Sequence, residues 1–149
     1  MTDHTFELGT DGPKVILVGV DGSDSSLRAA AYAWGLARRQ GSRLVIVHAA
    51  PAGGLSSTTP GGAALLQEAT RQILDDIRQQ VQQAAERDNV AYEIITGQGD
   101  AYTVISRTAD TVRADAVVVG ASTQAGHRFI GSVAVRLVKS GRWPVTVVP

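Results

Sequence analysis

The sequence predicts an α/β domain, a three-layer α/β/α sandwich with a five-stranded parallel sheet. Five short apolar runs rich in β-branched residues alternate with four segments in which apolar residues recur every three or four positions. The runs are apolar on both faces, which is typical of parallel strands covered by helices on both sides. Right-handed βαβ crossovers join such strands into one sheet, and 149 residues are the size of one domain.

Each predicted element follows from its own stretch of sequence. The strands are short apolar runs, and they are predicted at residues 15–20, 44–47, 92–96, 116–120 and 144–148. The helices are apolar stripes with polar residues between them, and they are predicted at residues 27–37, 66–84, 101–112 and 133–138. Gly41 and Gly141 end the first and last helices, and Ser132 is the expected N-cap of the last. Residues 51–62 and 121–131 are predicted loops.

The start of the chain is expected to differ from the rest. Residues 1–14 show no periodicity and are predicted to form a flexible arm before a single domain at 15–149. This start also lacks the charged-then-apolar pattern of a signal peptide, and no apolar run reaches the ~18 residues of a spanning helix. We therefore expect a cytoplasmic protein.

Charge and composition exclude several functions. Fourteen Lys and Arg balance fourteen Asp and Glu, so the formal net charge is zero. Nucleic-acid-binding domains and polybasic membrane-surface proteins carry a basic excess, so neither partner is expected. The absence of cysteine excludes a disulfide scaffold, a thiolate nucleophile and a cysteine-ligated metal.

Ligands of an open parallel sheet bind beyond the carboxyl ends of the strands, where the strand order reverses. The segments 21–23, 48–50 and 120–132 are expected at this edge. Asp21 could accept hydrogen bonds from a ribose hydroxyl or a base amine, or it could form an Asx-turn that caps the next helix. His48 ends a buried strand, where a hydrogen-bonded core histidine is the preferred interpretation.

The segment after the fourth strand contains a Gly-x4-Gly spacing, from Gly126 to Gly131, that resembles a phosphate loop. Ser132 stands where such a loop has its lysine. Backbone N–H groups at a helix N-terminus can still hold a phosphate, with Arg128 or His127 supplying charge. A pair of tight-turn glycines explains the spacing equally well.

Enzyme templates are absent from the sequence. There is no Gly-x-Ser-x-Gly, no His-Glu-x-x-His and no Gly-x-Gly-x-x-Gly after a strand. Neither His4 nor His48 has a partner at metal-ligand spacing, and Asp75-Asp76 is best explained as a solvated helix face. Trp34 is predicted in the core, and Trp143 is predicted to anchor the start of the last strand. No catalytic residue and no metal site are predicted.

Four motifs make the chain resemble a single-domain universal stress protein from Val15 to Pro149. They are VGVDGSDSS at the end of the first strand, VIVHA at the end of the second, GDA before the third helix, and VVVG…GSV followed by WPVTVVP. The resemblance implies an adenine nucleotide alpha hydrolase-like (Rossmann-like) domain that is often dimeric. Some members of the family bind ATP and others do not.

The ATP-binding members carry Gly-x2-Gly-x9-Gly-Ser/Thr, and this chain departs from that pattern. Gly120 fills the first position and Gly131-Ser132 the last. Thr123 replaces the second glycine, and only seven residues separate it from Gly131, so the loop is two residues short. Thr tolerates a positive φ poorly, so the departure weakens the expectation of a phosphate grip.

By position in the motifs, Asp21 would meet the adenosine, the backbone of Ala49 the adenine edge, and the glycine-serine segment the ribose and phosphates. The full set of candidate binding residues is Asp21, Gly22, Ser23, Ala49, Gly120, Ser122, Gly126, Arg128, Gly131, Ser132 and Val133. The cofactor implied is ATP or AMP, with Mg²⁺ accompanying ATP.

The leading hypothesis is a stress-response module that acts by binding an adenine nucleotide, with at most weak ATPase activity. A homodimer is expected through the strand Val145–Val148, because an edge strand offers unpaired N–H and C=O groups. The alternative is a nucleotide-free, dimeric interaction or regulatory module, favoured by the shortened loop. A flavin carrier or a hydrolase on a similar fold is a weaker third hypothesis.

Overall fold

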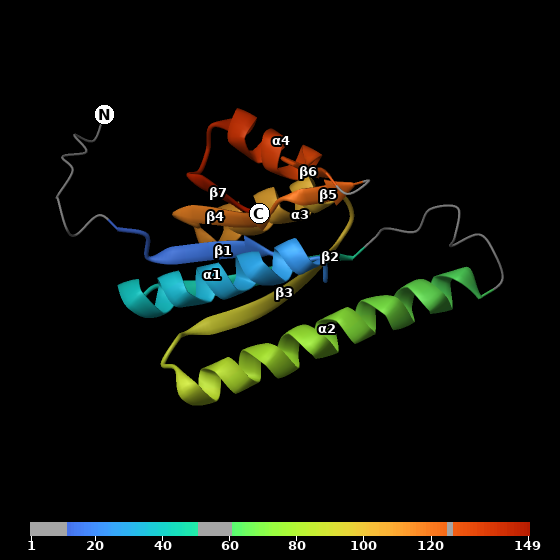
Figure 1. The fold of residues 1–149 in the computed structure, drawn as a ribbon, viewed down its shortest axis with the longest axis horizontal. Helices are drawn as coiled ribbons and strands as arrows, with labels where there is room; N and C mark the ends of the chain where they lie inside the picture. The colour runs from blue at the N-terminus through green and yellow to red at the C-terminus, as the bar shows by residue number, and fades with distance from the viewer. Residues whose placement is uncertain (1–11, 51–60, 125–126) are drawn as a thin grey trace.

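The computed structural model describes residues 12–50, 61–124 and 127–149, and it confirms the predicted parallel sheet. The five strands of this sheet are β1 (Val15–Gly19), β2 (Arg43–Ala50), β3 (Tyr92–Gln98), β4 (Ala116–Gly120) and β7 (Val145–Val148). They lie in the order β3-β2-β1-β4-β7, and every pair is parallel (Figure 1). The order therefore reverses between β1 and β4.

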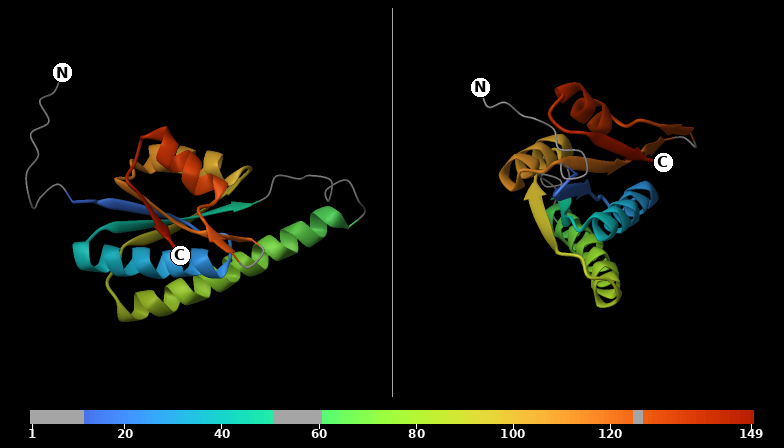
Figure 2. Two further views of the ribbon diagram at one scale, coloured as in Figure 1. Left: turned by 45° about the horizontal axis from the view of Figure 1, so that its top comes forward. Right: turned by 90° about the vertical axis from the view of Figure 1, so that its left-hand side faces the viewer.

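Four helices cover the sheet, two on each face (Figure 2). They are α1 (Asp24–Gln40), α2 (Gly62–Arg87), α3 (Ala101–Val112) and α4 (Ser132–Ser140). Alternate residues of a strand face opposite sides, so Ile16 and Val18 pack under α1 and α2 while Leu17 packs under α3 and α4. Two apolar cores result, which explains why the strands are apolar throughout.

Local capping explains where the helices begin and end. Ser23 caps α1 by accepting a hydrogen bond from the Ser26 N–H, and Asp100 caps α3 in the same way. Gly41 and Gly141 end α1 and α4 with φ of 68° and 66°, as predicted. The expected N-cap of α4 was wrong: Gly131 occupies that position, and Ser132 is the first helical residue.

The prediction of a plain loop at 121–131 was also wrong. The described part of this segment forms an antiparallel pair of short strands, β5 (Ser122–Gln124) and β6 (His127–Phe129). Thr123 lies opposite Arg128 in this pair. A strand position suits β-branched threonine, so the glycine that the family pattern places here is not needed for a positive φ. Gly126 lies outside the described residues.

The start of the described chain is tied to the domain. The Ser42 hydroxyl donates to the Pro13 carbonyl at 2.6 Å, and the Asp115 carboxylate accepts from the Lys14 and Val15 N–H groups at 2.9 Å. These contacts hold the last residues of the predicted arm, whereas residues 1–11 and 51–60 lie outside the described part. Within the described residues, none of the helices is both long and apolar enough to cross a membrane.

The two tryptophans pack against opposite faces of the sheet. Trp34 of α1 is buried in the core that α1 and α2 cover, and its indole N–H donates to Asp88 at 2.9 Å. Trp143 is half-buried against the other core, beside the start of β7.

His48 is 3% exposed and its Nδ1 donates to the Val20 carbonyl at 2.9 Å, as expected for a core histidine. Asp75 and Asp76 are exposed on α2.

Candidate nucleotide-binding cleft

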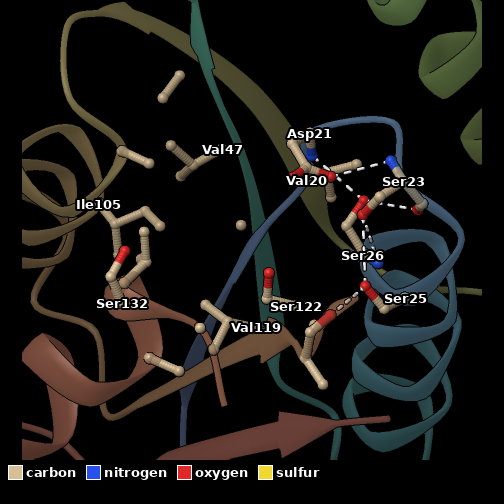
Figure 3. A pocket seen from close by; sticks show the side chains of 18 residues that line it. Val20, Asp21, Ser23, Ser25, Ser26, Val47, Ile105, Val119, Ser122 and Ser132 are labelled. Carbon is tan, nitrogen blue, oxygen red and sulfur yellow. Dashed lines mark hydrogen bonds between the residues drawn. The ribbon is translucent and has the colours of Figure 1, made fainter. Parts of the chain in front are cut away.

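A cleft of about 300 Å³ opens at the carboxyl ends of β1 and β4, where the strand order reverses. Its volume is at the lower end of the ~300–1,000 Å³ usual for ligand pockets. The N-terminal ends of α1, α3 and α4 all contribute to its walls, through Ser25, Ala101 and Ser132 among others. Figure 3 shows the serines of α1 on one side of this space and Ser132 on the other.

Asp21 is the ionisable residue of the described cleft wall. Its Oδ1 accepts the Ser23 N–H at 2.9 Å, which forms the Asx-turn that the sequence allowed. Partial burial alone would raise the pKa of Asp21, but hydrogen bonds from Ser23 and Ser26 outweigh it and hold the pKa below its usual value. The carboxylate is therefore charged at neutral pH. The Asx-turn and a ligand-binding role are compatible, because Asp21 is exposed to the cleft.

Gly120 allows α1 to approach the end of β4 closely. A Cβ built on Gly120 would lie 2.6 Å from the backbone carbon of Ser25 and 2.7 Å from the backbone nitrogen of Ser26. Only glycine fits this contact without a shift of α1. The buried Ser25 hydroxyl completes the junction by donating to the Ala121 carbonyl at 2.5 Å. Gly120 thus positions the start of α1 at the cleft.

The N-terminus of α4 differs from those of α1 and α3. Side chains cap α1 and α3, whereas α4 starts from Gly131 with no side-chain cap. The first N–H groups of a helix have no partner within it, and the helix dipole places about half a positive charge there. Gly131 also packs closely, since a Cβ there would lie 2.8 Å from the Ser122 Cβ. The start of α4 is therefore the part of the cleft best suited to an anion.

The peptide of Ala49 forms another polar part of the wall. The Val20 N–H donates to the Val47 carbonyl at 2.8 Å, so residue 47 faces β1. The Gly99 N–H donates to the Ala50 carbonyl at 3.0 Å, so residue 50 faces β3. Ala49 therefore faces the β1 side, beyond the point where pairing with β1 ends at Gly19. Its backbone donor and acceptor lie at the cleft without a described strand partner.

The structure brings together eight of the eleven predicted binding residues. These lining residues are Asp21, Ser23, Ala49, Gly120, Ser122, Gly131, Ser132 and Val133. Gly22 does not line the cleft; with φ of 88° it turns toward the Ile73 side chain of α2. Arg128 is placed by its backbone alone, in β6, and Gly126 lies outside the described residues.

Sequence reasoning missed a further group of lining residues. They are Gly19, Val20, Ser25, Ser26, Val47, Ala101, Ile105, Val119, Ala121 and Ala134. Most are small or apolar and carry no chemical signature. Ser25 and Ser26 gave no separate signal either, because serine is common at a helix start and its burial depends on contacts with distant residues.

Comparison with known families gives the cleft its context. The model of the "Universal stress protein family" matches residues 13–149, which is nearly the whole chain. The chain belongs to the universal stress protein family. A universal stress protein of Methanocaldococcus jannaschii is 29% identical over 140 residues, covering 91% of this chain and 81% of the relative.

Solved structures of universal stress proteins share the fold. One from Lactobacillus plantarum has a TM-score of 0.79 at 25% identity, over 91% of this chain and 97% of that one. A universal stress protein in complex with cAMP has a TM-score of 0.67 at 27% identity, over 92% and 97%. One from Archaeoglobus fulgidus in complex with dAMP has a TM-score of 0.59 at 25% identity, over 90% and 96%. This universal stress protein thus has the adenine nucleotide alpha hydrolase-like fold.

Proposed function

We propose that this universal stress protein binds an adenine nucleotide, AMP or ATP, in the cleft and serves as a regulatory or protective module in the stress response. The observation that carries the proposal is the meeting of three helix N-termini around one cleft, with a single carboxylate on its wall. The relatives crystallised with cAMP and dAMP support it, since both ligands are adenine nucleotides.

The uncapped start of α4 would hold the phosphate. The N-cap side chains of Ser23 and Asp100 already occupy donors at the starts of α1 and α3. Asp21 also lies beside α1, and its negative charge disfavours an anion there. The phosphate is therefore expected at Gly131 and Ser132, with the Ser132 hydroxyl as an added donor.

The adenosine would then lie between α4 and the end of β2. The Asp21 carboxylate can accept hydrogen bonds from the two ribose hydroxyls. The Ala49 peptide offers one donor and one acceptor, which matches the edge of an adenine ring. Val20, Val47 and Val119 supply apolar wall for the base.

The cleft is suited to occupancy more than to turnover. Among its described lining residues Asp21 is alone in being ionisable, so no acid–base pair is formed there. We expect at most weak ATPase activity. Among the described residues no group of three His, Cys, Asp or Glu could hold a metal, so Mg²⁺ would enter bound to the phosphates of ATP.

We also propose that the protein is a homodimer through β7. This strand lies at the edge of the sheet, so its outer N–H and C=O groups have no partner strand in the described chain. A second copy could continue the sheet there. A nucleotide-free, dimeric interaction module remains the competing function, and the same experiment separates the two.

Native mass spectrometry of the purified full chain tests nucleotide and dimer together. We expect a dimer mass that shifts by one nucleotide per subunit when AMP or ATP is added. In a matched thermal titration, a ligand at 100 Kd should stabilise the fold by ~2.7 kcal/mol. Asp21→Ala should remove most of that gain. Absence of any nucleotide-dependent mass or stability shift at millimolar AMP and ATP would favour the nucleotide-free alternative.

A further inference from the structure

The described residues that line the cleft supply little positive charge to its phosphate end. No Lys, Arg or His is among its described lining residues, and Asp21 adds a negative charge. Backbone dipoles contribute about half a charge at the start of α4, which matches one phosphate group better than three. A nucleoside triphosphate would need a cation from beside the cleft.

Arg136 stands beside this wall on α4. It follows Ser132 by four residues, so both side chains lie on the same side of the helix. Its Nη1 lies 3.3 Å from Asp100 Oδ1, and its guanidinium carbon lies 4.1 Å from the centre of the Tyr102 ring. Asp100 directly precedes Ala101, which lines the cleft. Arg136 thus bridges the starts of α3 and α4, the two helices whose first turns form one side of the cleft.

The contact that holds Arg136 is weak enough to exchange. Both side chains are about half exposed, and the ion pair uses a single nitrogen at 3.3 Å instead of a bidentate geometry. Asp100 does not depend on it, because Asp100 Oδ2 accepts from the Thr103 N–H at 2.9 Å and the Thr103 hydroxyl at 2.7 Å. Release of Arg136 therefore leaves the cap of α3 intact.

We propose that Arg136 is the residue by which this cleft prefers a nucleoside polyphosphate over a monophosphate. Its guanidinium leaves Asp100 and donates to the phosphates that extend beyond the start of α4. This role rests on the proposed nucleotide-binding function. Arg136 thereby joins His127 and Arg128 as a candidate source of the positive charge at the phosphate end.

Arg142 provides a matched control. It also pairs with an aspartate of α3, Asp110, and its guanidinium carbon lies 4.3 Å from the centre of the Trp143 ring. This second arginine–aspartate–aromatic group lies at the opposite end of α3, away from the cleft. Arg142→Gln therefore removes the same kind of contact without touching the phosphate end.

The experiment measures AMP and ATP affinities of the full-length chain by calorimetry at fixed Mg²⁺ and ionic strength. Arg136→Gln should weaken ATP about tenfold, as expected for loss of a charge-assisted hydrogen bond, and leave AMP within about twofold. Arg136→Lys should recover part of the ATP preference, and Arg142→Gln should change neither ligand. The salt dependence of ATP binding should also become shallower in Arg136→Gln.

Several results would overturn the proposal. If Arg136→Gln left both affinities unchanged, Arg136 would have no role in binding. If it weakened AMP and ATP equally, Arg136 would only support the packing of α3 against α4. A wild-type protein that binds AMP but does not prefer ATP would refute this inference and leave the proposed function standing. A wild-type protein that binds neither nucleotide would refute both.

Discussion

Replacing Gly120 by alanine tests whether the close contact between β4 and α1 builds the cleft. The new Cβ would meet the Ser25 carbon at 2.6 Å, the Ser26 nitrogen at 2.7 Å and the Ser25 oxygen at 2.8 Å. All three atoms belong to the backbone of α1, so no side-chain rotation relieves the clash. The start of α1 must move away from the sheet.

The magnitude follows from three contributions. Overpacking of this kind costs roughly 1–3 kcal/mol. The hydrogen bond from the Ser25 hydroxyl to the Ala121 carbonyl is stretched or lost, at about 1 kcal/mol. Alanine restricts the unfolded chain more than glycine does, which offsets the loss of stability by roughly 0.5–1 kcal/mol. We expect a net loss of about 2 kcal/mol in the free energy of unfolding, or a fall in Tm on the order of 5 °C for a chain of this size.

Urea unfolding followed by circular dichroism measures this loss, and Gly35→Ala is the control. Gly35 lies within α1, and nothing would lie within 4 Å of a Cβ there. Alanine at that helix position should stabilise the protein by roughly 0.5–1 kcal/mol. If Gly120→Ala also left stability unchanged or raised it, the close approach of α1 to β4 would be wrong. Nucleotide-induced stabilisation should fall in Gly120→Ala alone.

Three more predictions address phosphate binding at α4, the loss of stability at low pH and the proposed dimer. Ser132→Pro removes one N–H at the first position of α4, where proline is tolerated, so AMP binding should weaken several-fold while adenosine binding is kept. Ser132→Ala keeps this N–H and is the control. Equal AMP affinities of the two variants in calorimetry would contradict phosphate binding by the backbone. Hydrogen bonds from the Thr103 side chain and backbone lower the pKa of Asp100, so its charge stabilises the fold above the ordinary value of 3.8, and this contribution disappears as pH falls through the lowered value. The stability difference between wild type and Asp100→Asn should therefore shrink below pH 3.8 in urea titrations, and a constant difference would exclude the charge as its cause. Val147→Lys should convert the proposed dimer to a monomer in analytical ultracentrifugation. An unchanged mass would place the interface elsewhere.

The sheet and the helices were predictable because their patterns are local. The apolar run at 116–120 and the stripe at 101–112 coincide with β4 and α3 residue for residue. Each pattern repeats with the period of its own element, so the chain itself carries the information. The five-stranded parallel sheet followed from their alternation.

The 121–131 segment could not be predicted in the same way. Each of its strands has three residues, too few to show an alternation, and they form only by pairing with each other. The α4 cap was missed because Ser132 has the better cap side chain, yet the helix already begins at that residue. Ser25 and Ser26 were missed as lining residues because both are buried where the start of α1 meets Gly120, a contact between distant parts of the chain.

The N–H groups at the start of α4, which have no side-chain cap in the described chain, belong to peptide bonds and not to any side chain. Every residue except proline carries such a donor, so substitutions at 132 and 133 leave this grip in place wherever the helix still begins there. Two chains of this fold can therefore share an anion site although no residue of the site is identical between them. In such a site, the backbone conformation at the start of the helix has to be kept, and the side chains can differ.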